Sequence, residues 1–216
     1  VGGFLVASVY AVGMLKGRRD RYHYLGFVIA FTVGAIATPI QLGIGDGLAR
    51  WVYQNQPVKF AALELLPNTE SDAPETLLGH LNDNYTVSGG LPIPGLASWL
   101  SDPSTGKNTV VQGLTSVPPD QRPTIRQVNT VHLCWDIMVG LGTALFLLAV
   151  WYAVSWIFRR RMPQTKWFLR AAAVAGPAAV VAMEAGWVVT EVGRQPWIVY
   201  GHMRVEDAVT ANPGVW

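Results

Sequence analysis

Four long apolar stretches dominate the chain and constrain its fold more than any other feature. Three of them are close to the roughly 20 residues that a helix needs to cross a bilayer: residues 24–44, 139–158 and 171–190. Glu184 is the one charged residue among these three. The fourth stretch, residues 1–15, is uncharged but shorter, and we interpret it as the end of a truncated helix. Buried helices of a large soluble protein are disfavoured, because each stretch ends in a basic cluster or a long polar loop.

The composition agrees with a membrane protein and excludes several other classes. Hydrophobic residues make up 50% of the chain and charged residues 14%, well below the roughly 25% typical of soluble domains. The single cysteine, Cys134, excludes a disulfide framework or an all-cysteine metal site within the chain. The net charge of +2 gives no indication of nucleic acid, and we expect no nucleic-acid partner.

The basic residues indicate how the chain is oriented, because short cytoplasmic loops are enriched in Lys and Arg. Two short loops, residues 16–23 and 159–170, hold nine of the 16 basic residues and a single acid, Asp20. Residues 45–130 hold five basic and eight acidic residues. The short loops should therefore face the cytoplasm, and the long segment should face the outside.

These patterns predict an all-α fold, a polytopic transmembrane helical bundle with a long extracytoplasmic loop. Residues 1–44 would form two transmembrane helices joined by a basic cytoplasmic loop, and residues 45–127 would form the outer loop. Residues 128–197 would form two more helices, again with a basic cytoplasmic loop. Residues 198–216 would then emerge on the outside.

The outer loop is far longer than the 2–8 residues usual between bundled helices. Its many prolines and polar turn residues are typical of a disordered insert. However, residues 57–66 look helical, and a group of apolar residues could anchor the loop, namely Leu91, Ile93, Leu96, Trp99 and Leu100. Long loops with their own apolar anchors are more often functional. We therefore expect a folded, functional loop whose middle, about residues 68–88, is mobile.

Two charged residues stand out within the helical part of this loop. Pro57 can open a helix at its first turn, and Lys59 and Glu64 then lie about 140° apart around the helix axis, too far for an ideal ion pair. A cation and a carboxylate at the membrane surface could contact a polar ring and move its protons. The alternative is an interfacial turn with solvated charges, which the spacing by itself favours.

The fourth span carries a stripe of functional side chains. Glu184, Trp187, Glu191 and Arg194 follow one another at intervals of three, four and three residues, which places them on one helical face. Such a face suits a buried cofactor, because a carboxylate can ligate iron and an arginine can form a bidentate pair with a propionate. The alternative is a Glu–Arg pair with tryptophans of the aromatic belt.

The third span holds His132, Asp136 and Met138 near its outer end. Met is a known axial haem ligand, although a lone Met in an apolar helix is more often packing material. His132 and Asp136 are four residues apart and could satisfy each other. The sequence contains no C-x-x-C-H attachment motif, and its four histidines form no cluster, so any haem would be held non-covalently.

Several of these residues lie in motifs that resemble a known family. The pattern G-W-x-x-x-E-x-G-R-Q-P-W, from Gly186 to Trp197, resembles the signature of subunit I of cytochrome bd-type quinol oxidases. The segment from Lys59 to Glu64 is similar to that family's quinol-loop motif, and Ile137-Met138-Val139 to the segment with the Met ligand of its low-spin haem b. The resemblance covers the whole chain, in the order of helices five to eight of that subunit.

The resemblance implies a role for each candidate residue. Lys59 and Glu64 would bind or deprotonate quinol, with Gln56 as a further candidate. Met138 would be an axial ligand of the low-spin haem b. The high-spin haem b would be ligated by Glu191 and contacted by Trp187 and Arg194, and Glu184 would lie on a proton or electron route.

The resemblance also implies an activity and an assembly. Electrons from quinol would pass through the two b haems to haem d, where oxygen is reduced to water, which would build a proton gradient without pumping. The partners would be subunit II of the oxidase, a small single-helix subunit, membrane quinol and the lipid bilayer. The protein would be a multi-pass protein of the bacterial cytoplasmic (inner) membrane, and the fragment would be inactive alone.

Two features depart from the family. The His partner of Met138 would lie just before Val1, and the haem d ligand near the family's N-terminus, so neither is in this chain. Asp136 occupies a position where the family more often has Arg or Gln. Two other interpretations remain: an ion- or proton-translocating transporter that uses Glu184 and Glu191, and a non-catalytic scaffold that presents the outer loop.

Overall fold

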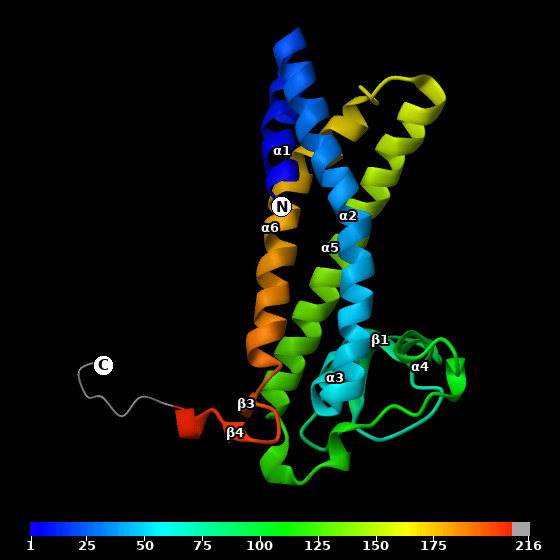
Figure 1. Cartoon of the computed structure of the whole chain (residues 1–216), viewed down its shortest axis with the longest axis vertical. Coiled ribbons are helices and arrows are strands. Elements are labelled where there is room, and N and C mark those ends of the chain that lie inside the picture. The colour runs from blue at the N-terminus through cyan, green and yellow to red at the C-terminus, as the bar shows by residue number, and fades with distance from the viewer. Residues whose placement is uncertain (209–216) are drawn as a thin grey trace, which may run out of the picture. The chain divides into compact units, whose positions relative to one another are not determined.

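The computed structural model describes residues 1–208, which form long helices and two small β-hairpins (Figure 1). The chain divides into two compact units. The first contains Val1–Gly45 and Ile137–Ala185, and the second contains Asp46–Asp136 and Gly186–Trp216. Three helices contribute residues to both units: α2 (Arg21–Asn55), α5 (Ile125–Arg159) and α6 (Lys166–Val192). The units are therefore described one at a time.

The first unit consists of helical segments and the two short loops that join them. It contains α1 (Gly2–Leu15) and parts of α2, α5 and α6. Its core is built around Phe31, whose ring centroid lies 5.2 Å from that of Phe27, 5.5 Å from that of Phe168 and 4.9 Å from that of Tyr152. Such clusters bury large apolar areas and favour edge-on and offset ring contacts.

Small residues let α1 approach its neighbours closely. A Cβ atom at Gly34 of α2 would lie 3.1 Å from the ring of Phe4, and one at Gly176 of α6 would lie 2.5 Å from the Ser8 hydroxyl. The contact at Gly34 would be tight, and the one at Gly176 is closer than Cβ atoms come in proteins. Close approach over small residues is typical of helices that pack in membranes, where burial of apolar surface gives no driving force.

Three helices, α2, α5 and α6, are long and apolar enough to cross a bilayer, among the residues that the structure describes. The prediction of a helical membrane fold is confirmed. α1 is apolar but only 14 residues long. Side chains of α2 remain exposed to the surroundings along one face of the first unit, which suits lipid or protein neighbours: Ile29, Val33, Ile36 and Ile40.

The long helices extend beyond the apolar stretches that predicted them. α2 continues past residue 44 to Asn55, and an ion pair four residues apart, Asp46–Arg50 at 2.8 Å, lies in this polar extension. Helical hydrogen bonding continues where hydropathy ends, because polar residues at this spacing also support a helix. α5 likewise begins at Ile125, ahead of the expected residue 128.

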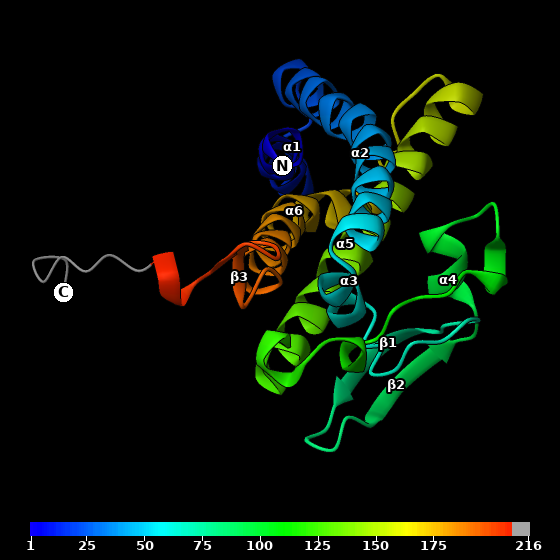
Figure 2. The ribbon, with the colours of Figure 1, turned by 60° about the horizontal axis from the view of Figure 1, so that its bottom comes forward.

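The second unit contains the outer loop and is built around an apolar core. The loop begins with α3 (Pro57–Leu63) and continues through the antiparallel hairpin of β1 (Glu75–Leu81) and β2 (Val87–Ile93) to α4 (Leu96–Ser101) (Figure 2). Three short 3-10 turns lead on to α5: Gly106–Asn108, Leu114–Ser116 and Pro119–Gln121. The core includes apolar side chains from several parts of the loop and from α5: Phe60, Leu66, Leu81, Leu114 and Val128.

The hairpin occupies the part of the loop that we expected to be mobile. Two side chains of α5 hold it: the Asn129 amide exchanges hydrogen bonds of 2.7 and 2.9 Å with the backbone of Leu81, and Asp136 accepts one of 2.6 Å from the Leu78 N–H. These two side chains lie about 50 residues further along the chain. No local sequence pattern therefore predicts their contact with the hairpin.

The loop is also fastened at α4. The buried Ser98 hydroxyl accepts a hydrogen bond of 2.8 Å from the Ala73 N–H and donates one of 2.8 Å to the Thr109 carbonyl. An isolated antiparallel bridge joins Glu70 to Val111 nearby. These bonds, together with the core, support the expectation of a folded loop.

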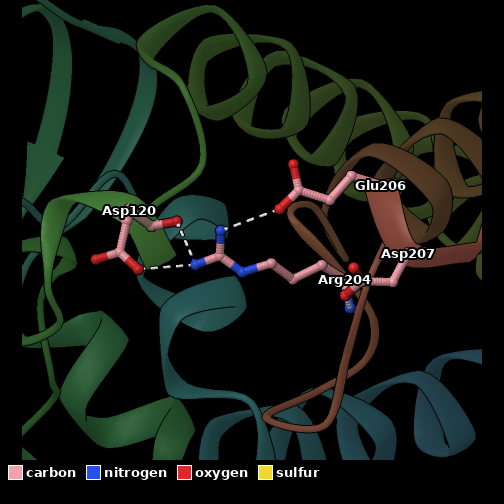
Figure 3. A network of polar contacts seen from close by, with 4 residues as sticks. All are labelled: Asp120, Arg204, Glu206 and Asp207. Atoms are coloured by element: carbon pink, nitrogen blue, oxygen red, sulfur yellow. Dashed lines mark hydrogen bonds and ion pairs between the residues drawn. The ribbon is translucent and has the colours of Figure 1, made fainter.

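The second unit ends in a short hairpin of β3 (Trp197–Val199) and β4 (Met203–Arg204), followed by a 3-10 turn at Glu206–Ala208. Arg204 joins this hairpin to the loop through an ion pair of 2.7 Å with Asp120, and it pairs at 3.3 Å with Glu206 of the turn that follows β4 (Figure 3). The predicted outer segment 198–216 lies only partly within the described residues, since residues 209–216 fall outside them.

Candidate functional site

A small pocket of about 40 Å³ in the second unit gathers polar side chains from two distant parts of the chain. Lys59 comes from α3, which begins at Pro57, where a proline is well tolerated because the first helical N–H has no partner. Arg194 and Gln195 come from the turn that follows α6. The remaining lining residues are Gln56, Val58, Pro123, Gly193, Trp197, Ile198 and Tyr200.

Gly193 lets Lys59 reach this pocket. A Cβ atom at Gly193 would lie 3.2 Å from Cε of Lys59 and against the carbonyl oxygen of Val189. Any larger residue would therefore displace the lysine side chain or the end of α6. The glycine of the G-R-Q-P-W motif is therefore required by the close packing of Lys59 against the end of α6.

The charge of Lys59 is destabilised by its surroundings. Burial lowers the pKa of the Lys59 ammonium, the nearby Arg194 guanidinium lowers it further, and the Glu191 carboxylate opposes both effects. A partly buried cation with amide and aromatic neighbours can bind a polar ring through its oxygen atoms. It can also give up a proton more readily than a solvated lysine.

Glu191 and Arg194 form an ion pair at the end of α6. Oε1 of Glu191 lies 2.5 Å from Nη2 of Arg194, and the side chains are 53% and 37% exposed. The pairing agrees with their spacing of three residues. Because both side chains remain partly open, the carboxylate keeps a free oxygen that could ligate a metal, and the guanidinium keeps free N–H donors.

Three of the four residues of the predicted stripe, Glu184, Trp187 and Glu191, lie on α6, whereas Arg194 lies in the turn after the helix. Trp187 is 62% exposed and Glu184 is exposed as well, on the helical face that also carries Glu191. A carboxylate and an indole on α6, with a guanidinium from the turn that follows it, have the donor chemistry to hold a haem: iron ligation by Glu191 and pairing of Arg194 with a propionate. The residues present therefore fit that cofactor.

Met138 lies on α5 in the first unit and is half-buried, as is compatible with a thioether that ligates a haem iron. Glu184 also belongs to the first unit, whereas Lys59, Glu64, Trp187, Glu191 and Arg194 belong to the second. Among residues 1–208, no three His, Cys, Asp or Glu side chains are grouped as a metal site. A haem ligated by one Met or one Glu of this chain needs no such group.

Glu64 does not line the Lys59 pocket. It lies directly after α3, is 3% exposed, and faces Glu75 of β1 and Asp136 of α5. Burial raises the pKa of Glu64 well above its usual value, and the hydrogen bond and negative charge of Glu75 and the charge of Asp136 raise it further.

The sequence analysis did not identify Glu75 as a functional candidate. Its position within a polar segment of the loop resembles that of any solvated acid, and it becomes notable only because the hairpin turns it inward. The expected contact between His132 and Asp136 is present, with Nε2 and Oδ2 3.4 Å apart. In the sequence, only the spacing of Asn129, His132 and Asp136 along one face of α5 indicated that polar side chains of this helix contact the loop.

Known proteins match the chain over nearly its whole length. The sequence model of the family "Cytochrome bd terminal oxidase subunit I" matches residues 1–216. The chain is 32% identical over 222 residues to a cytochrome bd menaquinol oxidase subunit I of Bacillus subtilis (strain 168), with 99% of this chain and 48% of that protein covered. It is 30% identical over 225 residues to the cytochrome bd ubiquinol oxidase subunit 1 of the same organism, with 98% and 46% covered.

A solved structure gives the same result. The fold is similar to the bd oxidase from Geobacillus thermodenitrificans, with a TM-score of 0.83 and 34% sequence identity over 99% of this chain and 48% of that chain. The chain spans about half the length of the curated relatives it matches. On its sequence and its fold, the chain belongs to the cytochrome bd terminal oxidase subunit I family.

Proposed function

We propose that this chain is part of a terminal respiratory oxidase that oxidises membrane quinol at the outer face and passes the electrons to oxygen. The family supports a quinol-oxidising oxidase, since the relatives are named as menaquinol or ubiquinol oxidases. The observation that carries the proposal is the pocket that brings Lys59 of the outer loop to the G-R-Q-P-W turn.

The pocket suits the head of a quinol. Gln56 and Gln195 supply amide groups that can donate to or accept from the two ring oxygens, and the Lys59 ammonium can donate as well. Trp197 and Tyr200 give the pocket aromatic walls. Because the chain places basic clusters in its short loops and this pocket in its long loop, the charge distribution supports an outer position for quinol oxidation.

The haems would be held by residues of the helices. Met138 of α5 would ligate the low-spin haem b. Glu191 would ligate the high-spin haem b, with Trp187 and Arg194 beside it and Glu184 further along the same helix face. A bound haem would supply one-electron chemistry that no side chain of this chain can provide, and haem d would be held by the rest of the protein.

The same orientation would let the reaction build a proton gradient without pumping. Quinol protons would be released outside, and the protons consumed with oxygen would be taken from the cytoplasm. The exposed apolar side chains of α2 support an environment of lipid and partner subunits in the cytoplasmic membrane, with subunit II and a small single-helix subunit as the partners.

Oxygen uptake by the purified full-length complex tests this function. Reduced quinol should drive oxygen consumption that depends on haem, whereas the same complex without quinol should be inactive. A haem-containing complex that consumes oxygen with an artificial donor but never with quinol would contradict the proposed quinol site.

A further inference from the structure

Two glutamates of the second unit meet in its core without a cation between them. Glu64 directly follows α3, and Glu75 is the first residue of β1. Their residues are 3% and 7% exposed, and the surrounding core is apolar. Oε2 of each side chain is buried and has no hydrogen-bond partner. Buried carboxylates are costly unless they are paired or neutralised.

Three side chains on one face of α5 hold the two glutamates in this position. His132 Nδ1 lies 2.7 Å from the carbonyl oxygen of Leu63, the residue before Glu64. Asp136 accepts from Leu78, and Asn129 bonds to Leu81, so that both fix the strand that Glu75 begins. α5 therefore binds both the end of α3 and the strand β1. The sequence of neither segment predicts that it lies near the other.

The protonation of the pair explains how two carboxyl groups are tolerated in the core. The Leu63 carbonyl can only accept, so His132 Nδ1 carries a hydrogen, and Nε2 of the same ring lies 3.4 Å from Oδ2 of Asp136. Both ring nitrogens of His132 therefore face Leu63 and Asp136. Within residues 1–208, Glu64 and Glu75 form no ion pair with a Lys, Arg or His. Two buried carboxyl groups without a cation are stabilised when one of them holds a proton, because the protonated group can donate to the other.

We propose that Glu64 and Glu75 form a carboxyl pair that shares one proton at rest and takes up a second from the quinol hydroxyl. This inference rests on the proposed quinol-oxidising function and adds Glu75 to it. In this step a quinol O–H bond breaks, a new O–H bond forms on a carboxylate oxygen of the pair, and the quinolate keeps the bonding electrons. The oxidation state of every group is unchanged.

The structure separates the roles of Lys59 and Glu64. Lys59 lines the pocket on one side of α3, and Glu64 lies in the core at the end of the same helix. Lys59 can therefore bind the quinol head while the pair receives the proton by way of water. Glu75 is a proton-holding residue that acts through Glu64, and it need not touch quinol.

Infrared difference spectroscopy of the full oxidase complex tests the pair directly. We expect a buried protonated carboxyl band in the wild type that disappears only at a pH well above the usual range of glutamate. Glu64→Gln should abolish the band. Glu75→Gln should retain it but shift its loss to lower pH, because the negative charge and hydrogen bond of Glu75 both raise the pKa of Glu64. Asp136 and His132 remain as the other groups facing the pair.

Turnover gives the second readout. Glu75→Gln should lower kcat with quinol by about 100-fold, as is typical for loss of a proton-transfer group, while the quinol KM and oxygen reduction with an artificial donor stay close to wild type. Glu75→Asp, which keeps a carboxyl, should recover part of the rate. Glu70→Gln is the matched control, since Glu70 is an exposed acid of the same loop, and it should change nothing.

The outcomes separate this inference from the proposed function. A wild-type complex without quinol-driven oxygen uptake contradicts the function itself. A wild-type complex that oxidises quinol but shows no protonated carboxyl dependent on Glu64, or an unshifted band in Glu75→Gln, overturns the pair alone. If Glu75→Gln fails to incorporate haem, the infrared titrations of the wild type and of Glu75→Asp test the pair instead. A carboxyl band that titrates at the usual pH of a glutamate overturns the inference.

Discussion

Lys59 and Arg194 line the same pocket, one from the start of α3 and the other from the turn after α6. Two cations in one small pocket repel each other, and Glu191 offsets this repulsion by pairing with Arg194 at 2.5 Å. The arrangement holds a lysine whose charge is lost more easily than that of a solvated lysine. It also joins the outer loop to the end of the helix that carries the proposed haem ligand Glu191.

Replacement of Lys59 should weaken quinol binding. Because burial and Arg194 lower the pKa of Lys59, its charge is lost at a lower pH than that of a solvated lysine, and the quinol KM of the wild type should rise as pH increases through that range. Lys59→Gln should show a KM raised about tenfold, the loss of one good hydrogen bond to a charged group, and no alkaline rise. Steady-state oxygen uptake against quinol concentration measures this.

Two further variants complete that experiment. Lys59→Arg should keep its charge at every accessible pH and lose the alkaline rise while retaining much of the affinity. Lys107→Gln removes an exposed lysine of the same loop and should behave as wild type. A quinol KM in Lys59→Gln that equals the wild-type value at all pH values would remove Lys59 from the site.

Met138→Leu should remove the absorbance of the low-spin haem b while the complex still assembles. Leucine has a similar volume and costs little in packing, but it offers no sulfur to iron. Reduced-minus-oxidised spectra of the purified complex provide the measurement. Met162→Leu replaces a buried methionine of the first unit and should leave the spectrum intact. An unchanged low-spin signal in Met138→Leu would refute the ligand assignment.

Ser98→Ala should loosen the outer loop. The substitution leaves the Ala73 N–H and the Thr109 carbonyl without their buried partner, which costs about 1–3 kcal/mol. Hydrogen exchange at the amides of α4 should accelerate accordingly. Ser71→Ala, at an exposed position of the same loop, should leave the exchange rates unchanged. Equal exchange in both variants would show that the loop does not depend on this bond.

The buried Glu64 should make stability depend on pH. Its pKa is raised in the folded state, so the folded protein binds a proton that the unfolded chain releases. Stability is therefore complete below the usual glutamate pKa and is lost as pH rises toward the folded value, by about 1.4 kcal/mol per pH unit. The midpoint of thermal unfolding should fall with pH in the wild type and less steeply in Glu64→Gln. Parallel curves would contradict this.

The sequence predicted some parts of this protein because they depend on neighbouring residues. Hydropathy located α2, α5 and α6, and helical spacing placed Glu184, Trp187 and Glu191 together on α6, although the helix ends before Arg194. The inward turn of Glu75 could not be predicted, because it depends on bonds from Asn129 and Asp136 to a strand about 50 residues away. The meeting of Lys59 with Arg194 is equally non-local, and the family resemblance had assigned the two residues to different ligands.

Quinol oxidation by the haems can be observed by adding reduced quinol to the purified, oxidised complex without oxygen and recording its visible spectrum. We predict that the haem bands change from oxidised to reduced within the turnover time, and that Lys59→Gln slows this change while chemical reduction still produces the full spectrum. A complex without haem bands, or one whose haems stay oxidised in the presence of quinol, would contradict the assignment of this chain to a quinol-oxidising oxidase.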